Sequence, residues 1–179
     1  MLAPEPDLVT ESGHHVWDEW AIEHETGLFL HALVRATKPR VVVEHGTGRG
    51  VAAEFLARAL TENGQGGRLI TFEPDDGYRA QAAERLAPLN VELQPGMGVP
   101  FHGDPDMVFV DCYGPHREPV IRHWLAEHPG NPLVVIHDAK RSYPFHLGTG
   151  VFLPGHDGLW VGRPGRQVAT SSRAHSVHT

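Results

Sequence analysis

Hydrophobic positions along the chain follow two spacings that alternate. Short runs of mostly apolar residues are typical of strands buried in a sheet, and they occur at 40–43, 69–72, 91–93, 107–110 and 133–136. Between these runs, apolar residues recur every three or four positions, which predicts helices. The predicted helices cover 16–37, 51–60, 76–86 and 118–127. Gly27 interrupts the first of them and could divide it into two.

Strands that alternate with helices predict right-handed strand–helix–strand units and a parallel sheet. Two further apolar runs, 151–153 and 159–161, flank the turn-forming sequence PGHDG and predict an antiparallel hairpin. We therefore expect an α/β fold. It is a Rossmann-like three-layer sandwich, whose mostly parallel sheet ends in a C-terminal antiparallel hairpin.

The length of 179 residues fits one domain. We expect a flexible lead over 1–15, a single domain over 16–167 and a disordered polar tail over 168–179. Apolar runs long enough for a membrane span are absent from the sequence, and its first residues lack the pattern of a signal peptide. The single cysteine, Cys112, suits a reducing compartment, so we expect a cytoplasmic protein.

The formal net charge of -7 bears on which class of partner the protein binds. Such an acidic chain lacks the positive surface of a general nucleic-acid binder, which favours a small-molecule partner over nucleic acid or membrane. Trp17 and Trp20, in the first predicted helix, could pack on a second copy of the chain. A homo-oligomer is therefore left open.

A glycine-rich turn follows the first strand, in the sequence VVVEHGTGRG. Ligands of open α/β sheets bind beyond the carboxyl ends of the strands, and glycines let the backbone approach them closely. A dinucleotide fingerprint would place its third glycine at position 51, which is Val51, and no phosphate-binding GK[ST] sequence occurs. Glu73 ends the second strand, where a carboxylate can accept hydrogen bonds from both hydroxyls of a ribose.

Together, VVVEHGTGRG and LITFEPD resemble class I S-adenosylmethionine-dependent methyltransferases, and the resemblance covers about 28–138. It implies S-adenosylmethionine as the cofactor, with the glycine turn at its methionine end and Glu73 at its ribose. The implied cofactor-binding residues are Glu44, Gly46, Thr47, Gly48, Gly50, Glu73, Pro74 and Asp111.

Ionisable residues also follow the fourth and fifth strands. Asp111 comes directly after 107–110, and His137 and Asp138 come directly after 133–136. In a parallel sheet these ends share one rim, and carboxylate oxygens suit Mg²⁺. Here the chain resembles metal-dependent small-molecule O-methyltransferases, in which an acid after the fourth strand and an acid pair after the fifth hold a divalent ion.

Asp111 and Asp138 match those metal-binding positions, whereas His137 replaces the first acid of the pair. An imidazole ligand shifts the preference toward Mn²⁺, Fe²⁺ or Zn²⁺. Alternatively, His137 is the general base and no metal is needed. His116 is a second candidate base, and Asp111 belongs to the same catalytic group.

The sequence therefore predicts an S-adenosylmethionine-dependent methyltransferase that acts on a hydroxyl group of a small molecule. The segment between Asp138 and Val151 is too short for a full helix, which favours an alternative: an accessory domain that binds the cofactor without transferring its methyl group. A third interpretation, an oxidoreductase using NAD or a nucleotide sugar, is disfavoured by Val51.

Overall fold

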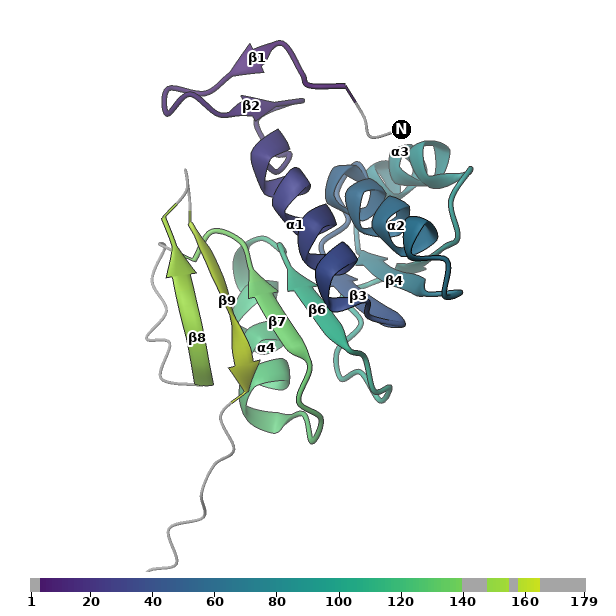
Figure 1. Cartoon of the computed structure of the whole chain (residues 1–179), viewed down its shortest axis with the longest axis vertical. Helices are drawn as coiled ribbons and strands as arrows, with labels where there is room; N and C mark the ends of the chain where they lie inside the picture. The colour runs from purple at the N-terminus through teal and green to yellow at the C-terminus, as the bar shows by residue number, and fades with distance from the viewer. Residues whose placement is uncertain (1–3, 140–147, 155–157, 165–179) are drawn as a thin grey trace, which may run out of the picture.

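The computed structural model describes residues 4–139, 148–154 and 158–164 (Figure 1). Its main sheet has seven strands in the order β5-β4-β3-β6-β7-β9-β8. Neighbours from β5 to β7 are parallel, whereas β9 runs antiparallel to both β7 and β8. The strands are β3 (Val41–His45), β4 (Arg68–Glu73), β5 (Val91–Pro95), β6 (Met107–Val110), β7 (Leu133–Ile136), β8 (Gly148–Leu153) and β9 (Leu159–Pro164).

Helices cover both faces of this sheet. Helices α1 (His24–Thr37), α2 (Val51–Asn63) and α3 (Asp76–Leu86) contribute to one hydrophobic cluster. On the other face lies α4 (Arg117–Arg122), preceded by the 3₁₀ turn η1 (Gly114–His116) and continued by the wider turn η2 (His123–Glu127). Figure 1 shows α1 and α4 on opposite sides of the strands. The predicted three-layer α/β fold with a closing antiparallel hairpin is confirmed.

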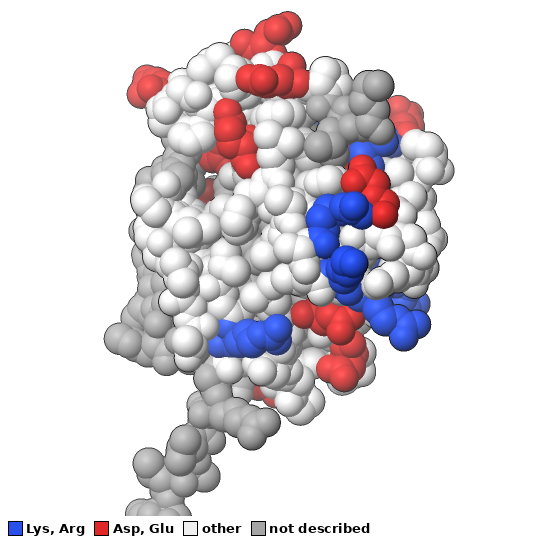
Figure 2. Space-filling model, viewed as in Figure 1, with Lys and Arg blue, Asp and Glu red and all other residues white. Residues whose placement is uncertain are grey.

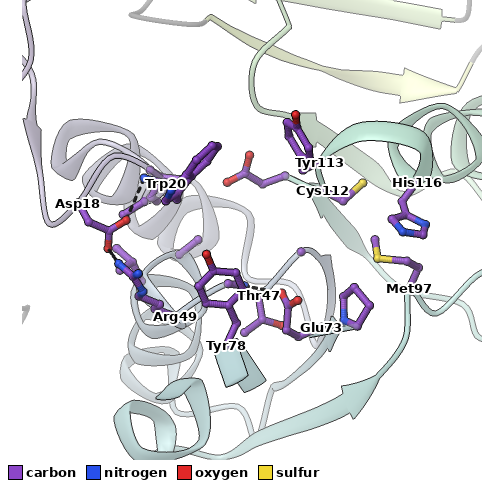
Figure 3. A pocket seen from close by; sticks show the side chains of 18 residues that line it. Asp18, Trp20, Thr47, Arg49, Glu73, Tyr78, Met97, Cys112, Tyr113 and His116 are labelled. Carbon is purple, nitrogen blue, oxygen red and sulfur yellow. Dashed lines mark hydrogen bonds and ion pairs between the residues drawn. The ribbon is translucent and has the colours of Figure 1, made fainter. Parts of the chain in front are cut away.

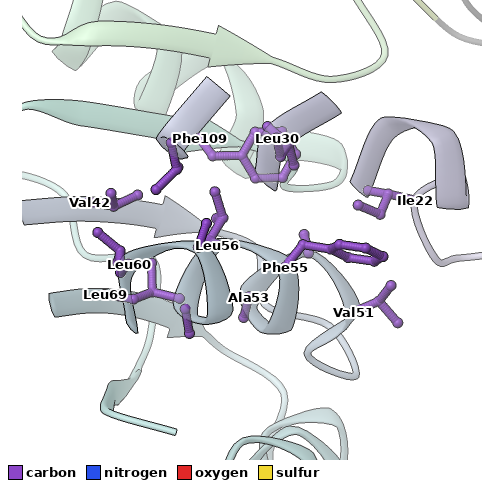
Figure 4. Packing of buried hydrophobic residues seen from close by; sticks show 14 of the residues in the cluster. Ile22, Leu30, Val42, Val51, Ala53, Phe55, Leu56, Leu60, Leu69 and Phe109 are labelled. Atoms are coloured by element: carbon purple, nitrogen blue, oxygen red, sulfur yellow. The ribbon is translucent and has the colours of Figure 1, made fainter. Parts of the chain in front are cut away.

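Successive residues of the central strands point to opposite faces, which explains why their sequences are continuously apolar. Val42 packs with α1 and α2, whereas its neighbour Val43 packs with α4. In β6, Phe109 likewise belongs to the cluster with α1 and α2, and Val108 to the cluster with α4. Figure 4 shows part of the first cluster, in which Phe55 of α2 is 1% exposed.

The first helix begins later than the sequence predicts. Residues 16–23 are not helical, and α1 starts at His24. The side chain of Asp18 accepts a hydrogen bond from the backbone N–H of Trp20 at 2.9 Å, and this local bond competes with helix formation. Upstream, β1 (Leu8–Val9) and β2 (His15–Val16) form a short antiparallel ribbon.

The predicted break at Gly27 is also wrong, because α1 passes through this glycine without interruption. A Cβ atom at Gly27 would lie 2.4 Å from Cε2 of Phe55, so the missing side chain lets α1 approach α2 closely. The predicted disordered tail over 168–179 lies outside the described residues.

Within the described part of the chain, no helix has the length and apolar character needed to cross a membrane. On the face drawn in Figure 2, most basic side chains gather along one side, where acidic side chains lie directly beside them.

Candidate functional site

The glycine turn between β3 and α2 folds back over the end of β4. The backbone N–H groups of Gly46 and Thr47 both donate to the carbonyl oxygen of Phe72, at 3.0 and 3.2 Å. Gly46 has φ +93°, and a Cβ atom there would lie 2.5 Å from the carbonyl oxygen of Asp111. Only glycine fits this approach, which brings the turn against the end of β6.

The carboxylate of Glu73 is held beside this turn. Its Oε2 accepts a hydrogen bond from the N–H of Gly48 at 2.7 Å, and its Oε1 accepts one from the N–H of Asp75 at 3.0 Å. The residue is only 6% exposed, so these two bonds fix its orientation. An ionised carboxylate has about four acceptor sites, and further donors from a ligand can therefore bind to it.

A cavity of about 410 Å³ lies over the turn and the end of β4 (Figure 3). A volume of this size is within the usual range for small-molecule sites. Seven of the predicted site residues line it: Gly46, Thr47, Gly48, Glu73, Pro74, Asp111 and His116. Glu44, Gly50, His137 and Asp138 are not among the lining residues.

A second wall of this cavity was not predicted, and the chain before α1 supplies it. Asp18 and Trp20 belong to this wall, and Asp18 Oδ2 pairs with Arg49 NH1 of the glycine turn at 2.5 Å. Trp20 and Tyr113 are 65% and 83% exposed. Their rings pack edge to face, with the ring centroids 6.2 Å apart. Figure 3 shows these two rings on one side of the cavity, with Glu73 and Thr47 across from them.

Glu44 lies beneath the turn and is fully buried. Its Oε2 accepts a short hydrogen bond from the hydroxyl of Thr71, whereas Oε1 has no hydrogen-bond partner among the described residues. Burial, opposed by the Thr71 bond and aided by the charges of Asp111 and Glu73, raises the pKa of Glu44 to about 8.

This raised pKa predicts how stability depends on pH. A carboxyl group whose folded-state pKa exceeds its unfolded value stabilises the fold fully below about pH 4.5, and this contribution is lost as the pH rises through about 8. In ligand-free protein, the free energy of unfolding of the wild type should therefore fall between about pH 4.5 and pH 8. In Glu44→Gln it should fall less over the same range, by on the order of 1 kcal/mol per pH unit. Urea unfolding at several pH values measures the difference, and parallel curves for the two proteins would contradict it.

His45, for which the sequence predicts no role, positions another part of the cavity wall. Its Nδ1 donates to the carbonyl oxygen of Met97 at 2.6 Å, and its Nε2 accepts from the indole N–H of Trp124 at 2.8 Å. Burial, the largest effect, lowers the pKa of His45 to about 4, so the ring is neutral and this tautomer is the one that satisfies both partners. Met97 lines the cavity, so His45 fixes the backbone of its wall.

His137 lies behind the cavity wall and contacts three carboxylates. Its Nδ1 is 2.9 Å from Asp111 Oδ1 and 3.4 Å from Asp138 Oδ1, and its Nε2 is 3.0 Å from Glu23 Oε2. Burial alone would lower the pKa of His137, but the charge of Asp111 and the two carboxylate hydrogen bonds raise it well above its usual value. Ligand atoms of Asp111, His137 and Asp138 all lie within 4.8 Å of one another.

No protein-family model matches the chain, and a search of curated proteins finds no match. Among solved structures, the O-methyltransferase TomG from Streptomyces achromogenes, involved in tomaymycin synthesis and solved in complex with S-adenosylmethionine, is 26% identical. It superposes with a TM-score of 0.65 over 82% of each chain.

Two further structures are similar in fold. A methyltransferase from Geobacter sulfurreducens is 23% identical, with a TM-score of 0.65 over 80% of each chain. The O-methyltransferase from Bacillus cereus, in complex with S-adenosylhomocysteine, is 19% identical with a TM-score of 0.65, over 82% of this chain and 84% of that one.

The fold matches that of class I S-adenosylmethionine-dependent methyltransferases, and the cavity of this chain lies at the carboxyl ends of β3, β4 and β6. Within that class, the chain is similar to the O-methyltransferase TomG. The resemblance predicted from the sequence is thereby confirmed.

Proposed function

We propose that the chain transfers a methyl group from S-adenosylmethionine to a hydroxyl group of a small molecule. The observation that carries this proposal is the fixed carboxylate of Glu73, held by the N–H of Gly48 at the edge of a cavity of about 410 Å³. A nucleoside ribose offers two neighbouring hydroxyl donors that fit this acceptor. The binding of S-adenosylmethionine by TomG supports the choice of cofactor.

The cofactor would lie across the glycine turn, with its ribose at Glu73 and its methionine end above Glu44. When bound, S-adenosylmethionine supplies a methyl group on a positively charged sulfur. Transfer would break the C–S bond of the cofactor as the acceptor oxygen bonded to the methyl carbon, and the acceptor would lose its hydroxyl proton. The task of this chain is therefore to orient the two molecules and to accept that proton.

Asp111 and His116 are two of the ionisable residues that line the cavity, and we place the acceptor hydroxyl beside them. We assign the acceptance of the proton to these two residues, because both can reach a ligand there. His137 is set back from the wall, with each ring nitrogen next to a carboxylate. We therefore infer that His137 positions Asp111 and does not contact the acceptor hydroxyl directly.

A divalent metal ion also fits the residues behind this wall. Asp111, His137 and Asp138 offer an oxygen, a nitrogen and an oxygen within 4.8 Å of one another. Such a mixed donor set suits transition-metal ions, and Nδ1 of His137 becomes available once its proton is released. A metal ion bound there would supply the positive charge that lowers the pKa of an acceptor hydroxyl.

Calorimetry with S-adenosylhomocysteine, followed by mass spectrometry of reactions with sugars, catechols and small amines, tests the proposal. We expect micromolar binding and methylation of a hydroxyl compound, with His116→Ala reducing turnover but leaving S-adenosylhomocysteine affinity unchanged. Binding without transfer to any of the compounds would favour the accessory domain, and absence of binding would refute both functions.

The small-molecule acceptor is the partner that the geometry supports. The expected absence of a nucleic-acid partner, a homo-oligomeric state, a cytoplasmic location and the division of the chain into lead, domain and tail stay predictions.

A further inference from the structure

Glu23 occupies an unusual position at the start of α1. It is the residue before the first helical turn, yet its side chain makes no hydrogen bond to the helix backbone. Instead, Oε2 accepts from the hydroxyl of Thr26 at 2.8 Å and from Nε2 of His137 at 3.0 Å. The residue is 4% exposed, and these two side-chain hydrogen bonds offset the cost of burying its carboxylate.

The two nitrogens of His137 face different partners. Nε2 points to Glu23, on the side of a small second cavity of about 170 Å³ that both residues line. Nδ1 points to Asp111 and Asp138, which are the other two candidate metal ligands. A histidine that binds a metal through one nitrogen usually donates the N–H of the other to a carboxylate, which fixes the ring and makes it a stronger ligand.

We propose that Glu23 is a positioning residue that holds His137 with Nδ1 toward Asp111 and Asp138, and that the resulting site prefers Mn²⁺, Co²⁺ or Zn²⁺ to Mg²⁺. This inference rests on the proposed function, since it deepens the metal site of the same cavity. The preference follows from the nitrogen ligand, because Mg²⁺ strongly favours oxygen. Glu23 acts through His137 and does not touch the acceptor.

Metal titrations of the full chain, saturated with S-adenosylhomocysteine, test both parts. Calorimetry with Mn²⁺ and with Mg²⁺ measures the affinities, and Co²⁺ absorption reports the nitrogen ligand. We expect Mn²⁺ to bind more tightly than Mg²⁺, and Glu23→Ala to weaken Mn²⁺ binding by about 10- to 100-fold. Glu23→Gln keeps an acceptor for the Nε2 proton, so its Mn²⁺ affinity should lie between those of the wild type and Glu23→Ala.

Glu25→Ala is the matched control, because Glu25 lies in the first turn of the same helix but pairs with His15. It should leave Mn²⁺ affinity and the Co²⁺ spectrum unchanged. Unaltered Mn²⁺ affinity in Glu23→Ala would overturn the role of Glu23, and equal affinities for Mg²⁺ and Mn²⁺ would overturn the preference. Absence of any metal binding, with S-adenosylhomocysteine still bound, would refute this inference alone.

Discussion

Replacing Glu73 by alanine is expected to weaken S-adenosylhomocysteine binding by at least about 100-fold. The change removes the acceptor for both ribose hydroxyls, and each hydrogen bond to a charged group contributes about 1.5–3 kcal/mol. It also removes the acceptor for the backbone N–H groups of Gly48 and Asp75, so the turn loses its connection to the end of β4. Calorimetry of the purified variant measures the loss.

Two comparisons make this result specific. Glu73→Gln keeps one carbonyl oxygen and should bind with intermediate affinity. Glu92→Ala removes a carboxylate from the neighbouring strand β5, where the side chain of Glu92 is 48% exposed and lies 3.7 Å from Arg68. That variant should bind like the wild type. If Glu73→Ala bound S-adenosylhomocysteine within threefold of the wild type, the ribose would not lie at Glu73.

Gly46→Ala is expected to lower the free energy of unfolding by about 2–5 kcal/mol. The positive φ angle of this residue costs a side chain about 1–3 kcal/mol, and overlap with a neighbour costs a similar amount. The overlapping atom is the backbone carbonyl oxygen of Asp111, which lies 2.5 Å from the Cβ position and cannot move without shifting the end of β6. Urea unfolding at one pH measures the change.

Gly66→Ala separates the two causes. Gly66 also has a positive φ angle, +67°, but nothing lies within 4 Å of its Cβ position. Its substitution should cost only the conformational part, about 1 kcal/mol. Equal losses in the two variants would show that the contact between the turn and Asp111 is not tight.

The fold was predictable because its signals are local. A strand such as β6 is buried on both faces, so its apolar run is continuous, and each glycine of the turn is required by its own backbone conformation. Glu73 was predictable for the same reason, since the end of a strand fixes its place on the rim. The late start of α1 was not predictable, because a single side-chain bond from Asp18 outweighs the helical spacing.

Contacts between distant parts of the chain account for the rest of the site. Trp20 meets Tyr113, and Glu23 meets His137 across 114 positions, and no short pattern in the sequence encodes either pairing. His45 was overlooked because it stands between two recognised positions, and its partners Met97 and Trp124 come from other elements. Residues that support a site through packing are found only once the layers are assembled.

The exposed ring of Trp20 gives this protein an optical reporter of its own. Of the four tryptophans, Trp124 and Trp160 are 0% and 6% exposed, and Trp17 is half-buried against Phe55. Trp20, at 65% exposure, is therefore the indole that a soluble quencher such as acrylamide reaches most easily. Because it lines the cavity, its fluorescence can follow the arrival and departure of a ligand in real time, without a label.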